Sequence, residues 1–223
     1  MAAKARPQKI ELGNAKLALY NVPPAKATVL AKWSDLQALS AYTGKDLVDL
    51  AAVATSQGDI PPSSIEAAAL PLLLRGANVD ATSLNIVGCA TVAAVAALAA
   101  VDFSDSSVQV LIVGKTDVHL AAIKAKITGA AEAAKKKVSF AAPNAPQGQI
   151  LIAPAEAVAG LERIPALKLV IVAELHAICT LPNVSPSVVA VASLPVQVLL
   201  LGSEVVLSHE DVTALKLRDS ELD

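Results

Sequence analysis

Few side chains in this sequence have both the chemistry and the spacing of an active site. The two cysteines, Cys89 and Cys179, lie in apolar runs and do not show the short spacing of a paired metal-binding motif. His119 and His176 share no HxH or HxxxH spacing that would bring two imidazoles to one metal ion. These residues predict neither a metal site nor a disulfide framework, and we expect the cysteines to be buried, reduced thiols.

The composition predicts one compact domain with a large apolar core. The chain has 223 residues, of which 54% are hydrophobic and 17% charged, and this balance excludes a disordered tail and a coiled coil. Aromatic residues make up only 2%, which leaves too few rings for a platform that stacks single-stranded bases. The core must therefore be built from Ala, Val, Leu and Ile.

Charge is balanced overall but uneven along the chain. The formal net charge is −2, without the basic excess typical of a protein that grips a polyanion. Residues 1–32 hold six cations and one acid, whereas residues 202–223 hold six acids and two cations. Two solvated termini would explain this asymmetry. The alternative is an irregular basic arm over residues 1–32 that contacts RNA or an acidic partner through Lys4, Arg6, Lys9 and Lys16.

Short β-branched runs alternate with longer alanine-rich stretches along the chain. The expected strands are Ser83–Val87, Val108–Val113, Ile150–Ala153, Leu167–Val172, Val188–Ala192 and Val196–Leu201. The expected helices are Ser64–Arg75, Thr91–Val101 and Thr116–Lys136. The strand runs are apolar on both faces, as strands covered by helices on both sides must be. The pattern predicts an α/β fold with a central, mainly parallel sheet flanked by helices on both faces.

Residues 81–101 carry no charge over a length that would cross a membrane. The stretch contains Thr82, Ser83, Asn85 and Thr91, and Gly88 divides it. A strand followed by a buried helix explains these residues better than a membrane span. We expect no contact with a membrane.

Six segments follow one another in the order and spacing of a known family. They are Pro62–Val79, Ser83–Ala90, Val110–Val118, Gln149–Pro154, Leu167–His176 and Val191–Pro195, preceded by Trp33-Ser34-Asp35-Leu36. They resemble the Q motif, the nucleotide loop, the PTREL, TPGR, DEAD and SAT motifs and the Phe-x-x-Leu start of DEAD-box RNA helicases. The resemblance implies a single RecA-like domain, the N-terminal one of the two that such helicases have.

The residues expected to bind ATP differ from the family's pattern. In the nucleotide loop Gly88 matches, but Cys89 takes the place of the lysine that offsets phosphate charge and Ala90 that of the hydroxyl on Mg²⁺. Ala173 stands where the family has a metal-binding Asp, and Glu174 keeps the family's Glu. Glu66 replaces the adenine-reading Gln. The resemblance therefore implies a degenerate site with no catalytic residue, no cofactor and no metal.

The motifs that contact RNA in the family are also changed. Thr116 lies at the PTREL arginine position, and the TPGR segment reads Pro154-Ala155-Glu156-Ala157. Lys115 is the one cation left nearby and is a candidate contact to RNA or to a partner. Its other interpretation is an ordinary surface lysine.

We expect a basic irregular arm over residues 1–32, a degenerate RecA-like domain over 33–205 and an acidic segment over 206–223. The leading hypothesis is a catalytically inactive pseudohelicase that acts as a structural or assembly component of a ribonucleoprotein. The alternative is a protein-interaction module that mimics one helicase domain and binds a protein partner without RNA. We expect partners to be protein subunits rather than small-molecule substrates. The cytoplasm is the expected compartment, and the basic, acid-poor N-terminus keeps a mitochondrial location open.

Overall fold

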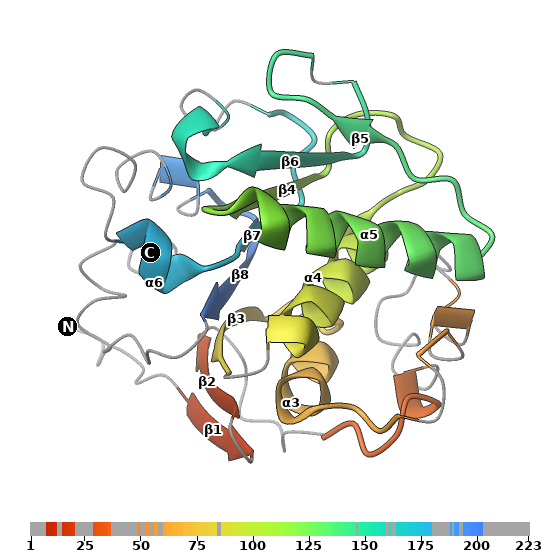
Figure 1. Ribbon diagram of the computed structural model, residues 1–223, viewed down its shortest axis with the longest axis vertical. Coiled ribbons are helices and arrows are strands. Elements are labelled where there is room, and N and C mark those ends of the chain that lie inside the picture. The colour runs from red at the N-terminus through yellow and green to blue at the C-terminus, as the bar shows by residue number, and fades with distance from the viewer. Residues whose placement is uncertain are drawn as a thin grey trace.

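The computed structural model describes most of the chain between residues 8 and 202 (Figure 1). The described residues are 8–12, 15–20, 29–36, 49, 52–53, 56–57, 60–83, 86–145, 147–158, 161, 164–179, 188, 190–191 and 194–202. Lys4, Arg6 and the acidic segment 206–223 lie outside them, so the expectations for those residues stay predictions.

The described chain is built on one sheet of eight strands in the order β1-β2-β3-β8-β7-β4-β6-β5. The strands are β1 (Gln8–Leu12), β2 (Ala15–Tyr20), β3 (Asn78–Thr82), β4 (Val110–Gly114), β5 (Phe140–Ala141), β6 (Ile150–Pro154), β7 (Leu169–Val172) and β8 (Gln197–Gly202). The strands from β3 to β5 in this order are all parallel, and β1 and β2 extend the sheet in antiparallel fashion. The predicted mainly parallel sheet is confirmed.

Helices cover the sheet on both faces, as predicted. The helices are α3 (Ser64–Leu73), α4 (Ile86–Ala100), α5 (Asp117–Ala133), α6 (Leu175–Cys179) and the short 3₁₀ turn η1 (Ala155–Ala157). Ile112 and Ile171 pack with α3, α4 and α5, whereas their neighbours Leu111 and Val170 pack with α6 and η1. Because successive strand residues point to opposite faces, both sides of the central strands are buried. The continuous apolar runs in the sequence follow from this burial.

The uncharged stretch of residues 81–101 consists of the end of β3, a connection and α4. Val92, Ala93 and Leu98 of α4 are fully buried between the sheet and its neighbouring helices. A helix that is apolar all round is expected in such a position. Among the described residues, no helix has the length and apolarity needed to span a membrane.

Two predicted strands, and the predicted irregular arm over residues 1–32, differ from what the described residues show. Strand β3 is Asn78–Thr82 rather than Ser83–Val87, because the polar alternation of Asn78, Asp80 and Thr82 hid it from a search for continuous apolar runs. Residues 188, 190 and 191 are helical, not part of a strand over Val188–Ala192. Val188 and Val191, three residues apart, are both buried in the core on the α6 face.

The N-terminal residues 8–12 and 15–20 are not irregular. They form the strands β1 and β2, paired from Gln8 with Leu19 to Leu12 with Ala15, and β2 continues the pairing onto β3. Lys9 lies in β1 and Lys16 in β2. Pairing with the rest of the sheet, which no local pattern encodes, orders this segment.

Three glutamine side chains make hydrogen bonds to the backbone at the amino ends of parallel strands. Gln109, just before β4, is fully buried, and its amide donates to the carbonyls of Asp102 and Asp105. Its oxygen accepts from the Lys168 Nζ at 2.6 Å and from the Asp102 N–H at 2.7 Å. Gln149 and Gln197 make similar bonds before β6 and at the start of β8.

Candidate functional site

The carboxyl ends of β4 and β7 bring together the best-defined polar cluster near the predicted site. In open parallel sheets, ligands bind at this edge. Glu174 follows β7 after one residue, and its Oε2 accepts from the backbone N–H of Lys115 at 3.0 Å and of Thr116 at 2.9 Å. The Thr116 hydroxyl lies 3.0 and 3.1 Å from the two carboxylate oxygens. Glu174 thus joins the loop after β4 to the loop after β7.

The backbone at Glu174 is held in an unusual conformation. Its φ is +56°, a region that residues other than glycine seldom adopt. The preceding residue, Ala173, is 1% exposed, and its N–H donates to the Val113 carbonyl at 2.7 Å. This tight connection aims the Glu174 side chain at the β4 loop. Ala173 itself carries no oxygen on its side chain that could hold a metal through water.

Glu174 is strongly held as a carboxylate. Burial alone would raise its pKa, but the hydrogen bonds from the Thr116 backbone and hydroxyl, the Lys115 N–H and the nearby His119 together lower that pKa below its ordinary value. His119 Nδ1 lies 3.5 Å from Glu174 Oε1, and the His119 side chain is 10% exposed. Its Nε2 is buried and has no hydrogen-bond partner among the described residues. These donors satisfy both carboxylate oxygens of Glu174.

The segment that resembles a nucleotide loop is too short to surround phosphates. Strand β3 ends at Thr82 and α4 begins at Ile86, so three residues connect them. A phosphate loop needs a longer glycine-rich connection whose N–H groups point inward, with its lysine at the start of the following helix. Gly88, Cys89 and Ala90 instead lie inside α4, where all three are buried.

Cys89 lies where the resemblance places the lysine, and its side chain carries no positive charge. Burial raises the pKa of the Cys89 thiol to about 12, and the negative charge of Glu66 adds to the rise. The thiol is therefore neutral and inert near neutral pH. Neither Cys89 nor Glu66 offers a positive charge to a phosphate.

Glu66, at the position of the adenine-reading glutamine, is occupied within its own helix. Its Oε2 accepts from the backbone N–H of Ser63 at 2.7 Å and from the Ser63 hydroxyl at 2.6 Å. This is a capping box, which satisfies free N–H groups at the start of α3. Trp33, at the aromatic start of the family pattern, is also committed, since its indole N–H donates to the Ile60 carbonyl at 2.8 Å.

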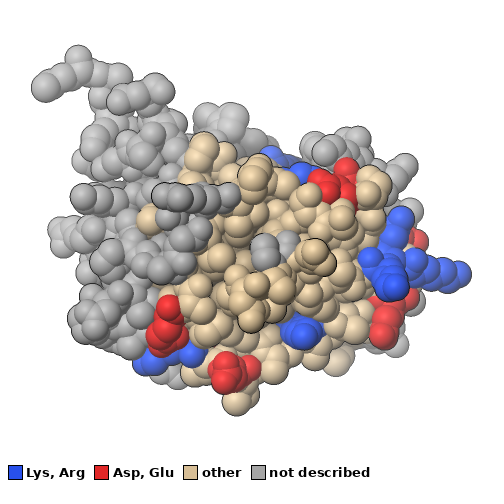
Figure 2. All heavy atoms as spheres, turned by 90° about the horizontal axis from the view of Figure 1, so that it is seen from above, with Lys and Arg blue, Asp and Glu red and all other residues tan. Residues whose placement is uncertain are grey.

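The predicted contact lysines do not gather at one place in the described chain. Lys115 is exposed beside Glu174, whereas Lys9 and Lys16 belong to β1 and β2 at the far end of the strand order. Figure 2 shows one face of the molecule, on which the charged side chains lie around the rim with both signs present and the middle of the described surface is uncharged. Acidic and basic side chains are mixed along this rim.

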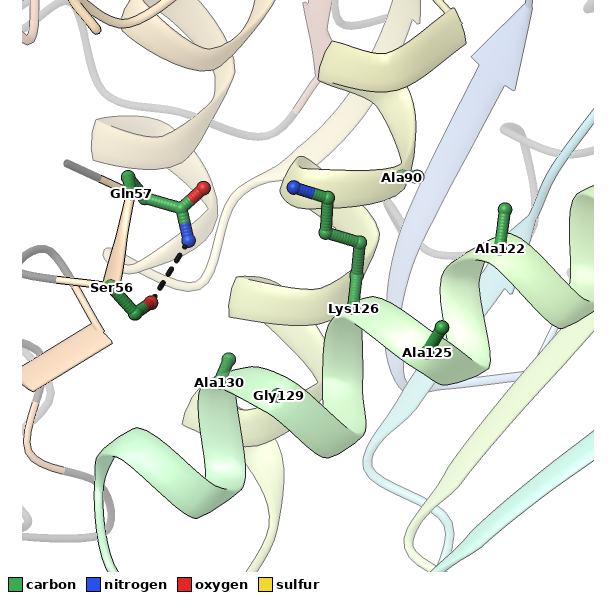
Figure 3. A pocket seen from close by; sticks show the side chains of 8 residues that line it. All are labelled: Ser56, Gln57, Ala90, Ala122, Ala125, Lys126, Gly129 and Ala130. Carbon is green, nitrogen blue, oxygen red and sulfur yellow. Dashed lines mark hydrogen bonds between the residues drawn. The ribbon is translucent and has the colours of Figure 1, made fainter.

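A cavity of about 590 Å³ lies between α4, α5 and Ser56 and Gln57, on the face of the sheet that α3, α4 and α5 cover (Figure 3). Lys126 extends across it from α5 toward Gln57 and Ala90, and Gln57 donates to the Ser56 hydroxyl at 3.2 Å. The remaining lining is alanine and glycine. This cavity was not predicted from the sequence, although the small residues Ala122, Ala125 and Gly129 follow one another at helical spacing along α5.

The pairing of Glu174 with Thr116 and His119 was not predicted from the sequence either. Thr116 was identified as a helix start, and its hydroxyl does accept from the His119 N–H at 3.3 Å. Its second role depends on a residue 58 positions away. Among the described residues, no group of three or more His, Cys, Asp or Glu side chains is arranged to hold a metal.

Comparison with known proteins supports the fold and goes no further. No protein-family model matches the sequence, and no curated protein matches it significantly. Among solved structures it is similar to S. cerevisiae Dbp5 bound to RNA and ADP BeF3, with a TM-score of 0.61 and 19% identity over 85% of this chain. A Dbp5 variant bound to a Gle1 variant and IP6 gives a TM-score of 0.66 at 17% identity over 86% of this chain.

This chain spans about half the length of those solved structures, 50% and 51% respectively. At such identities the likeness concerns the arrangement of strands and helices and not the residues of a site. The described chain therefore has the fold of a single RecA-like α/β domain, of the kind found in DEAD-box helicases.

Proposed function

We propose that this protein is a noncatalytic RecA-like domain, a pseudohelicase that serves as a structural or assembly component of a ribonucleoprotein. One observation carries the noncatalytic part: Cys89 and Ala90 are buried inside α4, which begins only three residues after β3. Without a loop, a lysine and a hydroxyl, the terms that stabilise a transferring phosphoryl group are missing.

Glu174 supports the same proposal. In an ATPase the carboxylate at this position would act on a water beside the γ-phosphate. Here its oxygens are occupied by Thr116 and Lys115, and the neighbouring Ala173 offers no metal ligand. The hydrogen bonds of Glu174 join the loops that follow β4 and β7. We propose that the domain is retained for its binding surface rather than for ATP hydrolysis.

The ribonucleoprotein part rests on the fold. The solved Dbp5 structures include one bound to RNA, and we propose that this chain likewise belongs to an RNA-containing complex. We further propose that Lys4, Arg6, Lys9, Lys16 and Lys115 contribute its contacts to RNA or to protein subunits. The proposed compartment is the cytoplasm, with mitochondria as the second candidate, and cell fractionation distinguishes the two.

A second candidate function is a module that mimics one helicase domain and binds a protein partner without RNA. It is favoured by the solved Dbp5 variant bound to a Gle1 variant, and by the mixture of acidic and basic side chains on the described part of the face in Figure 2. Affinity purification followed by mass spectrometry, with and without nuclease, separates the two functions. A ribonucleoprotein component co-purifies with RNA and is released by salt, whereas a mimic keeps its protein partner after nuclease treatment.

The noncatalytic proposal is tested by calorimetry with Mg-ATP. We expect no binding heat at millimolar nucleotide, and a dissociation constant in the low micromolar range would contradict the proposal.

A second experiment introduces the lysine and the hydroxyl of the helicase nucleotide loop through the double change Cys89→Lys and Ala90→Thr. Because residue 89 is buried in a helix, a lysine there should destabilise the fold without creating nucleotide binding. Ala125→Lys, on the exposed face of α5, is the control and should leave stability nearly unchanged.

A further inference from the structure

The outer edge of β1 is open in the described part of the chain. β1 is the first strand in the sheet order and pairs only with β2 there. The opposite edge strand, β5, has just two residues, which is one way proteins protect a sheet edge. β1 has five residues and contains no proline. A strand of this length can accept another strand by edge pairing.

The pairing of β1 with β2 determines which backbone groups point outward. Only two residues separate the strands, so Leu12 and Ala15 form the closing hydrogen-bonded pair. Hydrogen-bonded and non-hydrogen-bonded pairs alternate along an antiparallel ladder. Gln8, Ile10 and Leu12 therefore direct their N–H and C=O groups to β2, and Lys9 and Glu11 direct theirs to the open edge.

We propose that β1 pairs antiparallel with β1 of a second copy, centred on Ile10, and forms a symmetric dimer with one continuous sheet. In this register Lys9 lies opposite the partner's Glu11, and Glu11 lies opposite the partner's Lys9. Both are residues whose backbone groups point outward, so each pair can exchange two hydrogen bonds. The sequence Lys-Ile-Glu at the middle of the strand is complementary to itself in this direction.

Other registers are less favourable. In two other registers the outward-pointing backbone groups of β1 can still pair. One places Lys9 opposite the partner's Lys9 and the other places Glu11 opposite the partner's Glu11, and like charges directly opposite each other are destabilising. They also overlap fewer residues, whereas the register centred on Ile10 uses all five. Within one chain Glu11 is already the register partner of Lys16 in β2.

The proposed contact is small, since it involves one strand of each copy. Interfaces of this size are weak, and we expect reversible dimers that form at high protein concentration. This inference does not rest on the proposed function, but Lys9 is also one of the proposed contacts to RNA or protein subunits, so the Glu11→Lys variant tests the dimer without changing a proposed contact. Its measurement is made on nuclease-treated protein so that bound RNA cannot bridge two copies.

The test is sedimentation equilibrium of the full chain and of charge variants. Lys9→Glu and Glu11→Lys each create like-charged pairs at both symmetric positions, and each should raise the dimer dissociation constant by about tenfold or more. The double variant Lys9→Glu with Glu11→Lys restores complementarity and should recover dimers. A wild-type chain that stays monomeric up to about 1 mM, or dimers unaffected by single reversal, would overturn the proposal.

A cysteine experiment tests the register directly. At a non-hydrogen-bonded antiparallel pair the Cα atoms are about 4.5 Å apart, within disulfide range, so Ile10→Cys should give a disulfide-linked dimer on mild oxidation. Two copies of Gln8→Cys would lie roughly 13 Å apart and should not cross-link above the wild-type level. Equal cross-linking of both variants would contradict this register.

Discussion

Asp80 gives the sharpest stability prediction for this protein. It lies in β3 with Ala18 of β2 and Leu200 of β8 as its register partners. Directly opposite residues share a sheet face, so Asp80 lies on the face where Leu200 packs with Leu175 of α6. Burial in this apolar setting raises the pKa of Asp80 from 3.8 to about 6.

The sign of the effect follows from that rise. Between pH 4 and pH 6 the unfolded chain has lost the Asp80 proton while the folded chain keeps it, so stability falls as pH rises through this window. Above pH 6 the folded state carries the full cost of a buried carboxylate. A rise of about two pKa units corresponds to roughly 3 kcal/mol.

Replacing Asp80 by asparagine removes the charge and keeps the shape. We expect Asp80→Asn to increase the free energy of unfolding by up to about 3 kcal/mol near pH 8 and to have little effect near pH 4. Urea denaturation followed by circular dichroism at both pH values measures the difference. The matched control is Asp117→Asn, an exposed aspartate in the first turn of α5, which should cost less than about 1 kcal/mol. Equal pH dependence of the wild type and Asp80→Asn would refute the argument, because ionisation of Asp80 would then carry no cost in the fold.

Two further predictions concern the hydrogen-bond clusters at the two ends of the sheet. Glu174→Gln weakens the bonds from Thr116 and the contact to His119, and because Glu174 is partly exposed we expect a loss of about 1 kcal/mol at pH 7. The pKa of Glu174 is lowered in the fold, so its contribution to stability is lost as pH falls. The free energies of unfolding of the variant and the wild type should therefore become equal in acid. A constant difference between them down to pH 3 would argue against hydrogen bonds that depend on the Glu174 charge. Gln109→Leu removes the amide that bonds the Asp102 and Asp105 carbonyls and the Asp102 N–H, and thermal unfolding should show a loss of roughly 1 to 3 kcal/mol. A loss below about 0.5 kcal/mol would show that water replaces the amide.

The central strands and the cap of α5 could be predicted from local sequence. β4, β6 and β7 are buried on both faces, and such burial requires continuous β-branched and aliphatic runs that are visible along the chain. The helix predicted to begin at Thr116 agrees with the start of α5, because the Thr116 oxygen and the Asp117 acid satisfy a helix N-terminus wherever it lies.

The strands at the side of the sheet could not be predicted in the same way. β3 alternates polar and apolar residues and joins the antiparallel β2 on one side and the parallel β8 on the other. Val188 and Val191 have strand propensity but are helical where they pack beneath the sheet. In β3 and at Val188 and Val191, tertiary packing determines a secondary structure that the local pattern does not predict.

For the candidate site, the sequence by itself determined which chemistry is unavailable. Cys89, Ala90 and Ala173 cannot supply a positive charge, a hydroxyl or a carboxylate in any fold, because those groups are not in their side chains. Only the tertiary structure decided what the remaining residues do. Glu174 meets Thr116 across 58 residues because parallel strands bring distant loops to one edge of the sheet, whereas Cys89 lies in the field of Glu66 because α4 packs against α3. A pairing between segments so far apart leaves no periodic trace along the chain, since it is set by the order of strands in space.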